Sequence, residues 1–169
     1  PNGSALFAIE LPAGGGGETS FLNMYRAYET LPDALKHKLA GKFAIHDFTY
    51  TSAGTLRKGF QEVEDVRNAP GARHPILRTH PITGKTALFL GRRTNAYILG
   101  LTVEESEELL DAVWSHTENE GFVYTHSWRP GDLVLWDNRC VMHHRDAHAG
   151  THRRVMHRTQ LGREAPIAA

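Results

Sequence analysis

The fold of this chain is decided by the stretch Trp136-Asp137-Asn138-Arg139-Cys140-Val141-Met142-His143 and by Arg153-Arg154-Val155-Met156-His157-Arg158-Thr159-Gln160, which follows it. Each stretch joins a short apolar run to histidine or arginine, and a polar loop separates the two. Further short apolar runs lie just upstream, at 122–128 and 133–136. Short runs divided by turn residues predict consecutive β-strands.

Helical patterns lie earlier in the chain, between the first apolar run and this β-rich region. Thr102 and Glu105 fit a capping box, and four apolar residues recur on one face of the helix that follows: Leu109, Leu110, Val113 and Trp114. A second helical stretch is predicted from about Phe21, interrupted near Pro32 and ended at Gly41. The segments 74–81 and 85–90 predict a β-hairpin. We therefore predict a mainly β fold with helical insertions (α+β), built as a β-sandwich or jelly roll.

Composition describes one ordinary globular domain. The 169 residues hold 19 Lys plus Arg and 19 Asp plus Glu, so no bulk field favours nucleic acid or an anionic membrane. The chain contains a single cysteine, Cys140, which excludes an intramolecular disulfide and favours a reducing, cytoplasmic location. No apolar run reaches membrane-spanning length. The sequence begins Pro1-Asn2-Gly3 without methionine, so we expect residues 1–169 to be a single domain that lacks its N-terminal part.

Two metal-binding hypotheses arise from the histidines and acids around 143–148. In the first, His144, Asp146 and His148 form a local H-x-D-x-H cluster. In the second, His143 alone faces a barrel interior and its partner ligands come from elsewhere. The next strand favours the second hypothesis, because a period of two places Arg154, Met156, Arg158 and Gln160 on one face. Two arginines on one face can bind a carboxylate. The alternative, a surface basic strand that forms ordinary ion pairs, stays open at this point.

These motifs, in order, resemble the taurine and 2,4-dichlorophenoxyacetate dioxygenase family. The resemblance rests on the two stretches quoted first and on upstream segments that occur in the same order along nearly the whole chain: Gly16 to Thr19, Asn23 to Tyr28, His74 to Pro81 and Trp128 to Leu133. It implies a cupin-like double-stranded β-helix that holds iron(II) through two histidines and one carboxylate. It also implies 2-oxoglutarate as cosubstrate, O2 as oxidant, succinate as product, and hydroxylation of a small organic anion such as a sulfonate, sulfate ester or aryloxyalkanoate.

The resemblance assigns roles to four residues. His143 matches the distal histidine ligand of the metal. Arg158 matches the arginine that pairs with the far carboxylate of 2-oxoglutarate, and Thr19 matches its hydroxyl partner. Arg154 matches a second arginine, expected near the carboxylate that chelates iron. We expect a homo-oligomer without nucleic-acid or membrane partners.

The chain departs from the family pattern at the other two ligands. They belong to an H-x-D motif expected upstream of Pro1, and neither His46-Asp47 nor His144-Arg145-Asp146 has the right spacing and place. Taken alone, the chain is expected to be an inactive fragment. Two other classes remain open: a non-catalytic jelly-roll module that binds a ligand, and a redox-inert cupin-like metalloenzyme, against which the arginine pair argues. The 51–73 segment is a candidate lid, and the stretch 92–95, Arg-Arg-Thr-Asn, is either a solvated loop or an anion contact at the pocket mouth.

Overall fold

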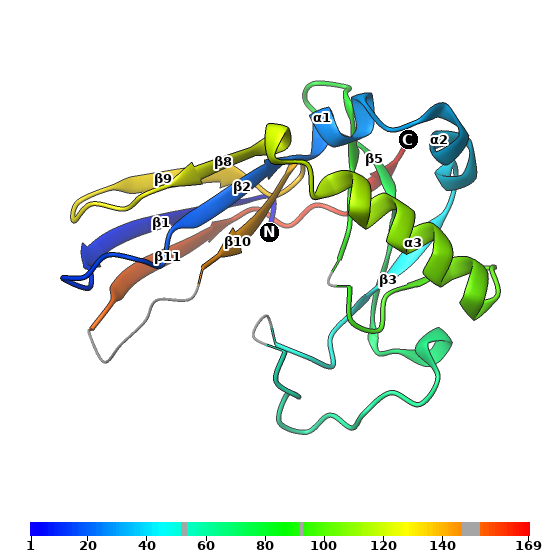
Figure 1. Ribbon diagram of the computed structural model, residues 1–169, viewed down its shortest axis with the longest axis horizontal. Coiled ribbons are helices and arrows are strands. Elements are labelled where there is room, and N and C mark those ends of the chain that lie inside the picture. Colours follow the sequence, from blue (N-terminus) through cyan, green and yellow to red (C-terminus); the bar gives the residue numbers. More distant parts are fainter. Residues whose placement is uncertain (52–53, 92, 147–152) are drawn as a thin grey trace.

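The structure, a computed structural model, describes residues 1–51, 54–91, 93–146 and 153–169. Its strands are β1 (Gly3–Glu10), β2 (Thr19–Asn23), β3 (Phe43–Asp47), β4 (Gly71–Pro75), β5 (Leu77–Thr79), β6 (Thr86–Leu88), β7 (Tyr97–Ile98), β8 (Val123–His126), β9 (Leu133–Asp137), β10 (Val141–Arg145), β11 (Val155–Leu161) and β12 (Ile167–Ala168). Its helices are α1 (Met24–Glu29), α2 (Asp33–Leu39) and α3 (Val103–Thr117), with short 3-10 turns at Val66–Asn68 and Glu120–Phe122. Figure 1 shows a stack of strands on one side and a helix-rich part on the other, so the predicted mainly β chain with helical insertions is confirmed.

Two antiparallel sheets form the stack of strands. One has the order β11-β1-β9 and the other the order β10-β2-β8. Their inner faces meet where the rings of Phe21 in β2 and Trp136 in β9 lie 5.3 Å apart between centroids. Ser4, which pairs with Trp136 across the first sheet, is only 1% exposed. The space between the two sheets is therefore closed at this level by side chains from both.

Strand alternation in the β11-β1-β9 sheet puts apolar side chains on the outer face. Phe7, Leu133 and Leu135 point outward and are 39%, 59% and 60% exposed. The inner face carries Ser4, Trp136 and Arg158 instead, since these residues alternate with the outer ones along their strands. Polar groups thus line the interior of the stack, where a functional site can form.

The helix-rich part contains the main apolar core. Two further sheets, β4-β3-β7 and β12-β5-β6, pack with α1 and α3 around fully or nearly fully buried side chains such as Leu39, Ile76, Leu110 and Val113. The predicted capping box is confirmed, because the Thr102 side chain accepts from the backbone of Glu105 while the Glu105 side chain accepts from the backbone of Thr102. The predicted hairpin is confirmed as β5 and β6.

The predicted helix start near Phe21 is wrong. Residues Thr19–Asn23 form β2, which pairs with both β8 and β10, and α1 begins only at Met24. Asn23 ends the strand and caps the helix, since its side chain accepts a hydrogen bond from the Arg26 backbone N–H at 3.0 Å. Pairing with two distant strands overrides the local helical pattern. The residues near Phe21 in the sequence give no sign of this pairing.

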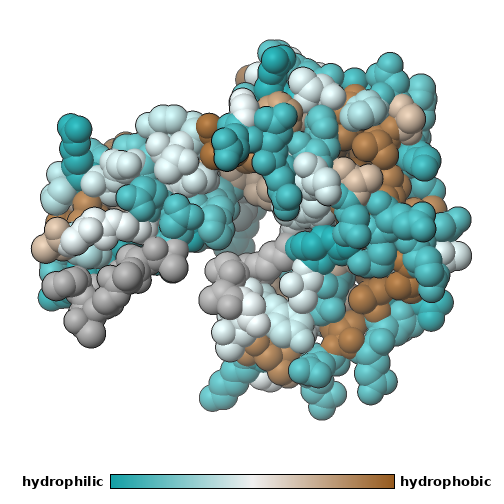
Figure 2. Space-filling view, viewed as in Figure 1, coloured by the Kyte–Doolittle hydropathy of each residue, from teal (hydrophilic) through white to brown (hydrophobic). Residues whose placement is uncertain are grey.

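The face drawn in Figure 2 is mostly hydrophilic and has an indentation between the strand stack and the helix-rich part. No helix in the described ranges combines the length and the apolar character needed to cross a bilayer.

The His46 side chain couples the stability of the fold to pH. Its ring lies against His74 (4.7 Å between centroids) and Phe89 (5.1 Å). Burial, and then the charge of His74, lower the pKa of His46 from 6.5 to about 4. Below pH 6.5 the His46 imidazole is therefore protonated in the unfolded chain, whereas in the folded chain it is protonated only near pH 4.

We accordingly expect the free energy of unfolding to fall between pH 6.5 and 4, by at most about 3 kcal/mol from this residue. His46→Asn should flatten that pH dependence in denaturant titrations, whereas His37→Asn, on the exposed face of α2, should leave it unchanged. An equally steep dependence in His46→Asn would contradict the assignment.

Candidate functional site

The four residues singled out in the sequence come from both sheets of the strand stack. Thr19 is the first residue of β2, His143 is the middle residue of β10, and Arg154 and Arg158 lie before and within β11. His143 pairs with Phe21, whose ring points between the sheets, so the His143 side chain points there too. The second metal-binding hypothesis, in which His143 faces the interior, agrees with this geometry.

The His143 imidazole lies against an aromatic wall. Its ring is 4.9 Å from that of Trp136, which in turn contacts Phe21. Burial lowers the pKa of His143, and the charges of Arg158 and His144 lower it further. This shift favours the uncharged form of the ring, in which a nitrogen lone pair is available to a metal ion.

Trp136 is held in place by its own hydrogen bonds. Its indole Nε1 donates to Asn138 Oδ1 at 2.9 Å, and Asn138 Nδ2 donates to the buried Ser4 Oγ at 3.0 Å. Neither Trp136 nor Trp128, which lies in the turn before β9, is among the site residues predicted from the sequence. Their positions inside the family-like motifs were the available signal, but only contacts across the sheets reveal what they touch.

The Thr19 side chain is buried, with 3% of the residue exposed. Its Oγ1 accepts a hydrogen bond from the indole Nε1 of Trp128 at 3.0 Å. Because an indole N–H can only donate, the hydroxyl proton of Thr19 remains available to an acceptor in the interior.

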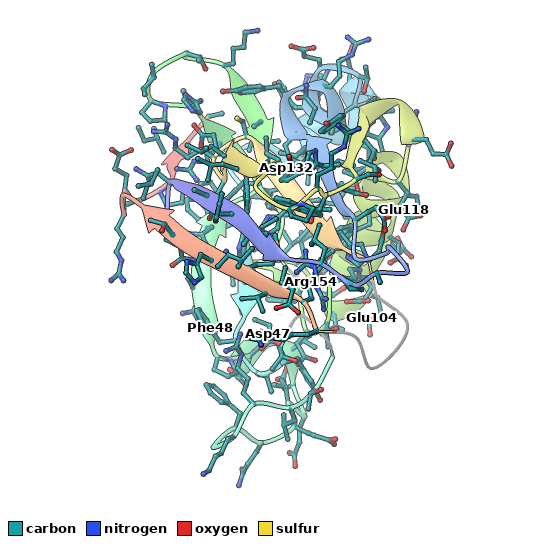
Figure 3. All side chains as sticks on the ribbon, turned by 90° about the vertical axis from the view of Figure 1, so that its left-hand side faces the viewer. Asp47, Phe48, Glu104, Glu118, Asp132 and Arg154 are labelled. Atoms are coloured by element: carbon teal, nitrogen blue, oxygen red, sulfur yellow. The ribbon has the colours of Figure 1, made fainter. Side chains whose placement is uncertain are left out.

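Arg154, rather than Arg158, lies close to the strand end that carries Thr19. Arg154 Nη2 donates to the carbonyl oxygen of Gly17 at 3.3 Å. Burial lowers the pKa of Arg154, and so does the charge of Arg145, the residue that pairs with Thr19 across β2 and β10. Figure 3 shows Arg154 among the strands of the stack. The contacts therefore favour Arg154 as the partner of Thr19, in place of the Arg158 that the sequence had suggested.

Arg154 also has an unused donor. Its Nε is buried and has no hydrogen-bond partner among the described residues. A buried guanidinium N–H without an acceptor is costly, and a bound carboxylate would satisfy it. Arg158 contributes at the other end, where its positive charge acts on His143. The interior thus offers a neutral imidazole at one place and a cation with a hydroxyl at another.

The local H-x-D-x-H hypothesis falls partly outside the described residues. His144 pairs with Ser20 on the opposite face of β10 and is exposed, and its Nε2 lies 3.4 Å from Asp146 Oδ1. His148 lies outside the described residues. The two described members of this cluster, His144 and Asp146, thus lie at the surface, and His144 is on the other face of β10 from His143.

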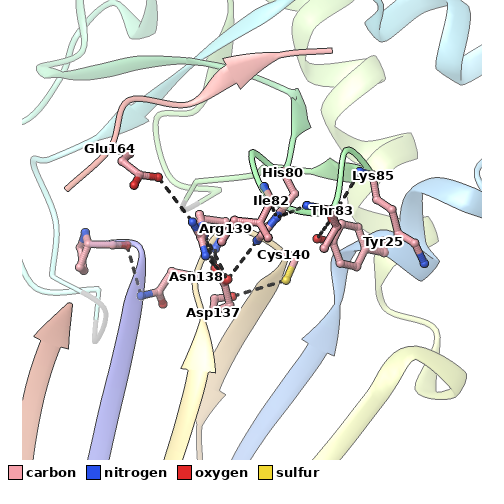
Figure 4. Close-up of polar contacts among 11 residues, drawn as sticks. Tyr25, His80, Ile82, Thr83, Lys85, Asp137, Asn138, Arg139, Cys140 and Glu164 are labelled. Atoms are coloured by element: carbon pink, nitrogen blue, oxygen red, sulfur yellow. Dashed lines mark hydrogen bonds and ion pairs between the residues drawn. The ribbon is translucent and has the colours of Figure 1, made fainter. Parts of the chain in front are cut away.

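Among the described residues, one group of three potential metal ligands lies elsewhere, and consists of His80, Asp137 and Cys140. Figure 4 shows why it forms a structural network. His80 Nδ1 accepts from the backbone N–H groups of Ile82 and Thr83, so its Nε2 donates to Asp137 at 3.0 Å. Arg139 donates hydrogen bonds to the same carboxylate from Nε and Nη2. Although burial alone would raise it, hydrogen bonds from Arg139 and His80 hold the pKa of Asp137 well below its usual range.

In the 92–95 segment, Arg93 is held by ion pairs and is not a free arginine at a pocket mouth. Arg93 Nη2 lies 2.7 Å from both Glu107 Oε2 and Asp111 Oδ1 on α3. Arg92 lies outside the described residues. Of the two alternatives for this loop, the contacts favour an ordinary surface role for Arg93. The last residues of the candidate lid, 71–73, belong to strand β4 (Gly71–Pro75) and not to a loop.

Comparison with known proteins places this geometry in context. The family described as "Taurine catabolism dioxygenase TauD, TfdA family" matches residues 1–160. An alpha-ketoglutarate-dependent 2,4-dichlorophenoxyacetate dioxygenase of Burkholderia sp. (strain RASC) is 40% identical over 168 residues, which are 98% of this chain and 55% of that protein. An alpha-ketoglutarate-dependent sulfate ester dioxygenase of Pseudomonas putida is 29% identical, over 99% of this chain and 57% of that protein.

A solved structure has a similar fold. The crystal structure of AAD-2 in complex with Mn(II) and N-oxalylglycine superposes with a TM-score of 0.78 and 30% sequence identity. The alignment covers 99% of this chain and 63% of that one. The chain thus spans about half the length of the curated relatives that it matches.

Proposed function

The chain belongs to the TauD, TfdA family of taurine catabolism dioxygenases, and on this premise we propose that the protein containing it is an iron(II)- and 2-oxoglutarate-dependent dioxygenase that hydroxylates a small organic anion. The observation that carries the proposal is that buried Thr19 and Arg154, which donates to the Gly17 carbonyl two residues before Thr19, face the same interior as the His143 imidazole. A metal ligand near an anion clamp suits a dicarboxylate that chelates a metal at one end.

In this proposal the two facing sheets belong to a double-stranded β-helix, and residues 1–169 form part of a single domain. The antiparallel strand orders β11-β1-β9 and β10-β2-β8, with polar side chains directed between them, support this architecture. We assign one metal ligand, His143, to the chain. The H-x-D ligands expected from the resemblance are assigned to no residue of it.

The residues present fit the cosubstrate. Arg154 offers a buried Nε–H without an acceptor, and Thr19 offers a hydroxyl whose acceptor side is already occupied. We therefore assign the far carboxylate of 2-oxoglutarate to Arg154 and Thr19. Arg158, whose charge acts on His143, is assigned to the carboxylate at the metal end. This exchanges the arginine roles that the family resemblance suggested.

The chain's own part in the reaction is to bind, orient and exclude water. Iron(II), when bound, supplies oxygen activation coupled to oxidative decarboxylation of 2-oxoglutarate. His143 would hold the metal through an imidazole nitrogen, and the Trp136 ring packs against one side of that imidazole. Arg154 and Thr19 fix the cosubstrate at its far end, so its keto-acid end is presented in one orientation.

The substrate class rests on the relatives. Two of them are named for 2,4-dichlorophenoxyacetate and for sulfate esters, which are small organic anions. We propose a substrate of this type, and the balanced overall charge of the chain means that its anion must be recognised by local groups.

The test is succinate formation by the complete gene product with Fe(II), O2 and 2-oxoglutarate. We expect an aryloxyalkanoate or alkyl sulfate to raise the rate at least about tenfold over the rate without substrate, because substrate binding completes the site. Pyruvate, which lacks the far carboxylate, should not replace 2-oxoglutarate. If the protein binds 2-oxoglutarate but forms no succinate with any of these substrates, the alternative of a non-catalytic ligand-binding module is favoured instead.

A further inference from the structure

Trp128 is the only described residue that hydrogen-bonds to the Thr19 hydroxyl. It lies in the turn between β8 and β9, whereas Thr19 begins β2, so the bond joins segments 109 residues apart. The indole Nε1 donates to Thr19 Oγ1 at 3.0 Å. A threonine hydroxyl can donate one hydrogen bond and accept others, and Trp128 fills an acceptor position with a group that cannot accept in return.

The Trp128 ring is itself held by a polar network. It packs edge-on against His126, with ring centroids 4.7 Å apart and an interplanar angle of 88°. His126 Nε2 lies 3.0 Å from Asp132 Oδ2, and that carboxylate also accepts from the Arg129 backbone N–H at 2.8 Å. The turn that carries Trp128 is thus closed by the bond between His126, the last residue of β8, and Asp132, directly before β9, and its indole N–H donates to Thr19.

We propose that Trp128 is a positioning residue for the cosubstrate. By occupying an acceptor position of Thr19, it directs the hydroxyl proton into the interior, where the far carboxylate of 2-oxoglutarate would accept it beside Arg154. Trp128 thereby contributes to the selection of a 2-oxo acid with a second carboxylate over one without it. This inference rests on the proposed function, and it adds a residue that never touches the ligand.

The test is Trp128→Phe in the complete gene product, because phenylalanine keeps a ring against His126 but removes the N–H. Direct calorimetric binding of 2-oxoglutarate, in the presence of Mn(II) and without turnover, is the first readout. We expect the dissociation constant to rise about fivefold, the effect of one neutral hydrogen bond. Binding of 2-oxobutyrate, which has no far carboxylate, should be unchanged. Trp114→Phe, in α3, is the matched control and should alter neither.

A double-mutant cycle separates positioning from a general structural effect. In a Thr19→Val background, Trp128→Phe should weaken 2-oxoglutarate binding no further, since the hydroxyl that it orients is gone. Thr19→Ser should keep both the affinity and the sensitivity to Trp128→Phe. The indole N–H resonance of Trp128 should move in Thr19→Val and not in Thr19→Ser, which checks the contact without any ligand and guards against misfolding.

The outcomes distinguish this inference from the proposed function. If the unsubstituted protein fails to bind 2-oxoglutarate, the proposed function fails and the inference fails with it. If that protein binds 2-oxoglutarate, the inference alone is overturned by either of two results. One is unchanged binding in Trp128→Phe. The other is a loss of 2-oxoglutarate affinity in Trp128→Phe that is equally large in the Thr19→Val background, or that is equally large for 2-oxobutyrate.

Discussion

Replacing His143 with alanine is expected to abolish succinate formation by the complete gene product and to weaken its metal binding by at least about 100-fold. Loss of groups that merely orient a metal ligand costs 10- to 100-fold, so loss of a ligand itself should cost at least as much. His143 suits the role because burial and the nearby charges of Arg158 and His144 lower the pKa of its imidazole, which weakens the competition of protons with the metal.

The measurement is equilibrium titration with Co(II), a spectroscopic substitute for Fe(II), alongside the succinate assay. The adjacent His144 supplies a matched control, because it is exposed on the other face of β10 and pairs with Asp146. His144→Ala should therefore retain metal affinity and turnover. If His143→Ala binds Co(II) as tightly as the unsubstituted protein, His143 is not a ligand.

Replacing Arg154 with alanine is expected to raise the dissociation constant for 2-oxoglutarate by about 100-fold or more. Removing one partner of a buried charged pair costs about 2–5 kcal/mol, because the other charge is left without its counterpart. Arg154→Lys should lie between alanine and arginine, since lysine keeps the charge but cannot offer the planar fork. Binding of 2-oxobutyrate should be nearly unaffected, so the variant loses its preference for the dicarboxylate.

Arg153→Ala is the matched control for this experiment. Arg153 is the preceding residue, its side chain is 76% exposed, and it pairs with Glu10 at 3.4 Å on the surface. Its loss should change 2-oxoglutarate affinity less than twofold. Arg158→Ala decides between the two assignments. If Arg158→Ala, and not Arg154→Ala, removes the preference for the dicarboxylate, then the pairing of Arg158 with Thr19 first suggested by resemblance is correct.

Several elements were predictable because the residues that determine them lie close together in the chain. The start of α3 depends on Thr102 and Glu105, which are three positions apart and bond to each other. The β5–β6 hairpin depends on the turn between its strands. The shared face of Arg154 and Arg158 follows from the period of two along an extended segment.

Other features could not be predicted, because they depend on distant partners. Phe21 lies in a strand and not in a helix because β8 and β10, more than 100 residues later, pair with β2. The short strand β12 exists only through its pairing with β5. Trp128 meets Thr19 through a contact that no local pattern specifies.

By itself, the sequence determined the mainly β class and the family resemblance, because those depend on local periodicity and on motif order, and it predicted a small set of site residues. Only the tertiary structure shows that Arg154 donates to the carbonyl of Gly17, two residues before Thr19. Four residues along a strand separate Arg154 from Arg158 by about 13 Å, so a single carboxylate group cannot meet both at one point. Which of them lies beside Thr19 depends on the register of β11 against β1 and on the path of the chain through Gly17, and both are set by contacts between segments far apart in sequence.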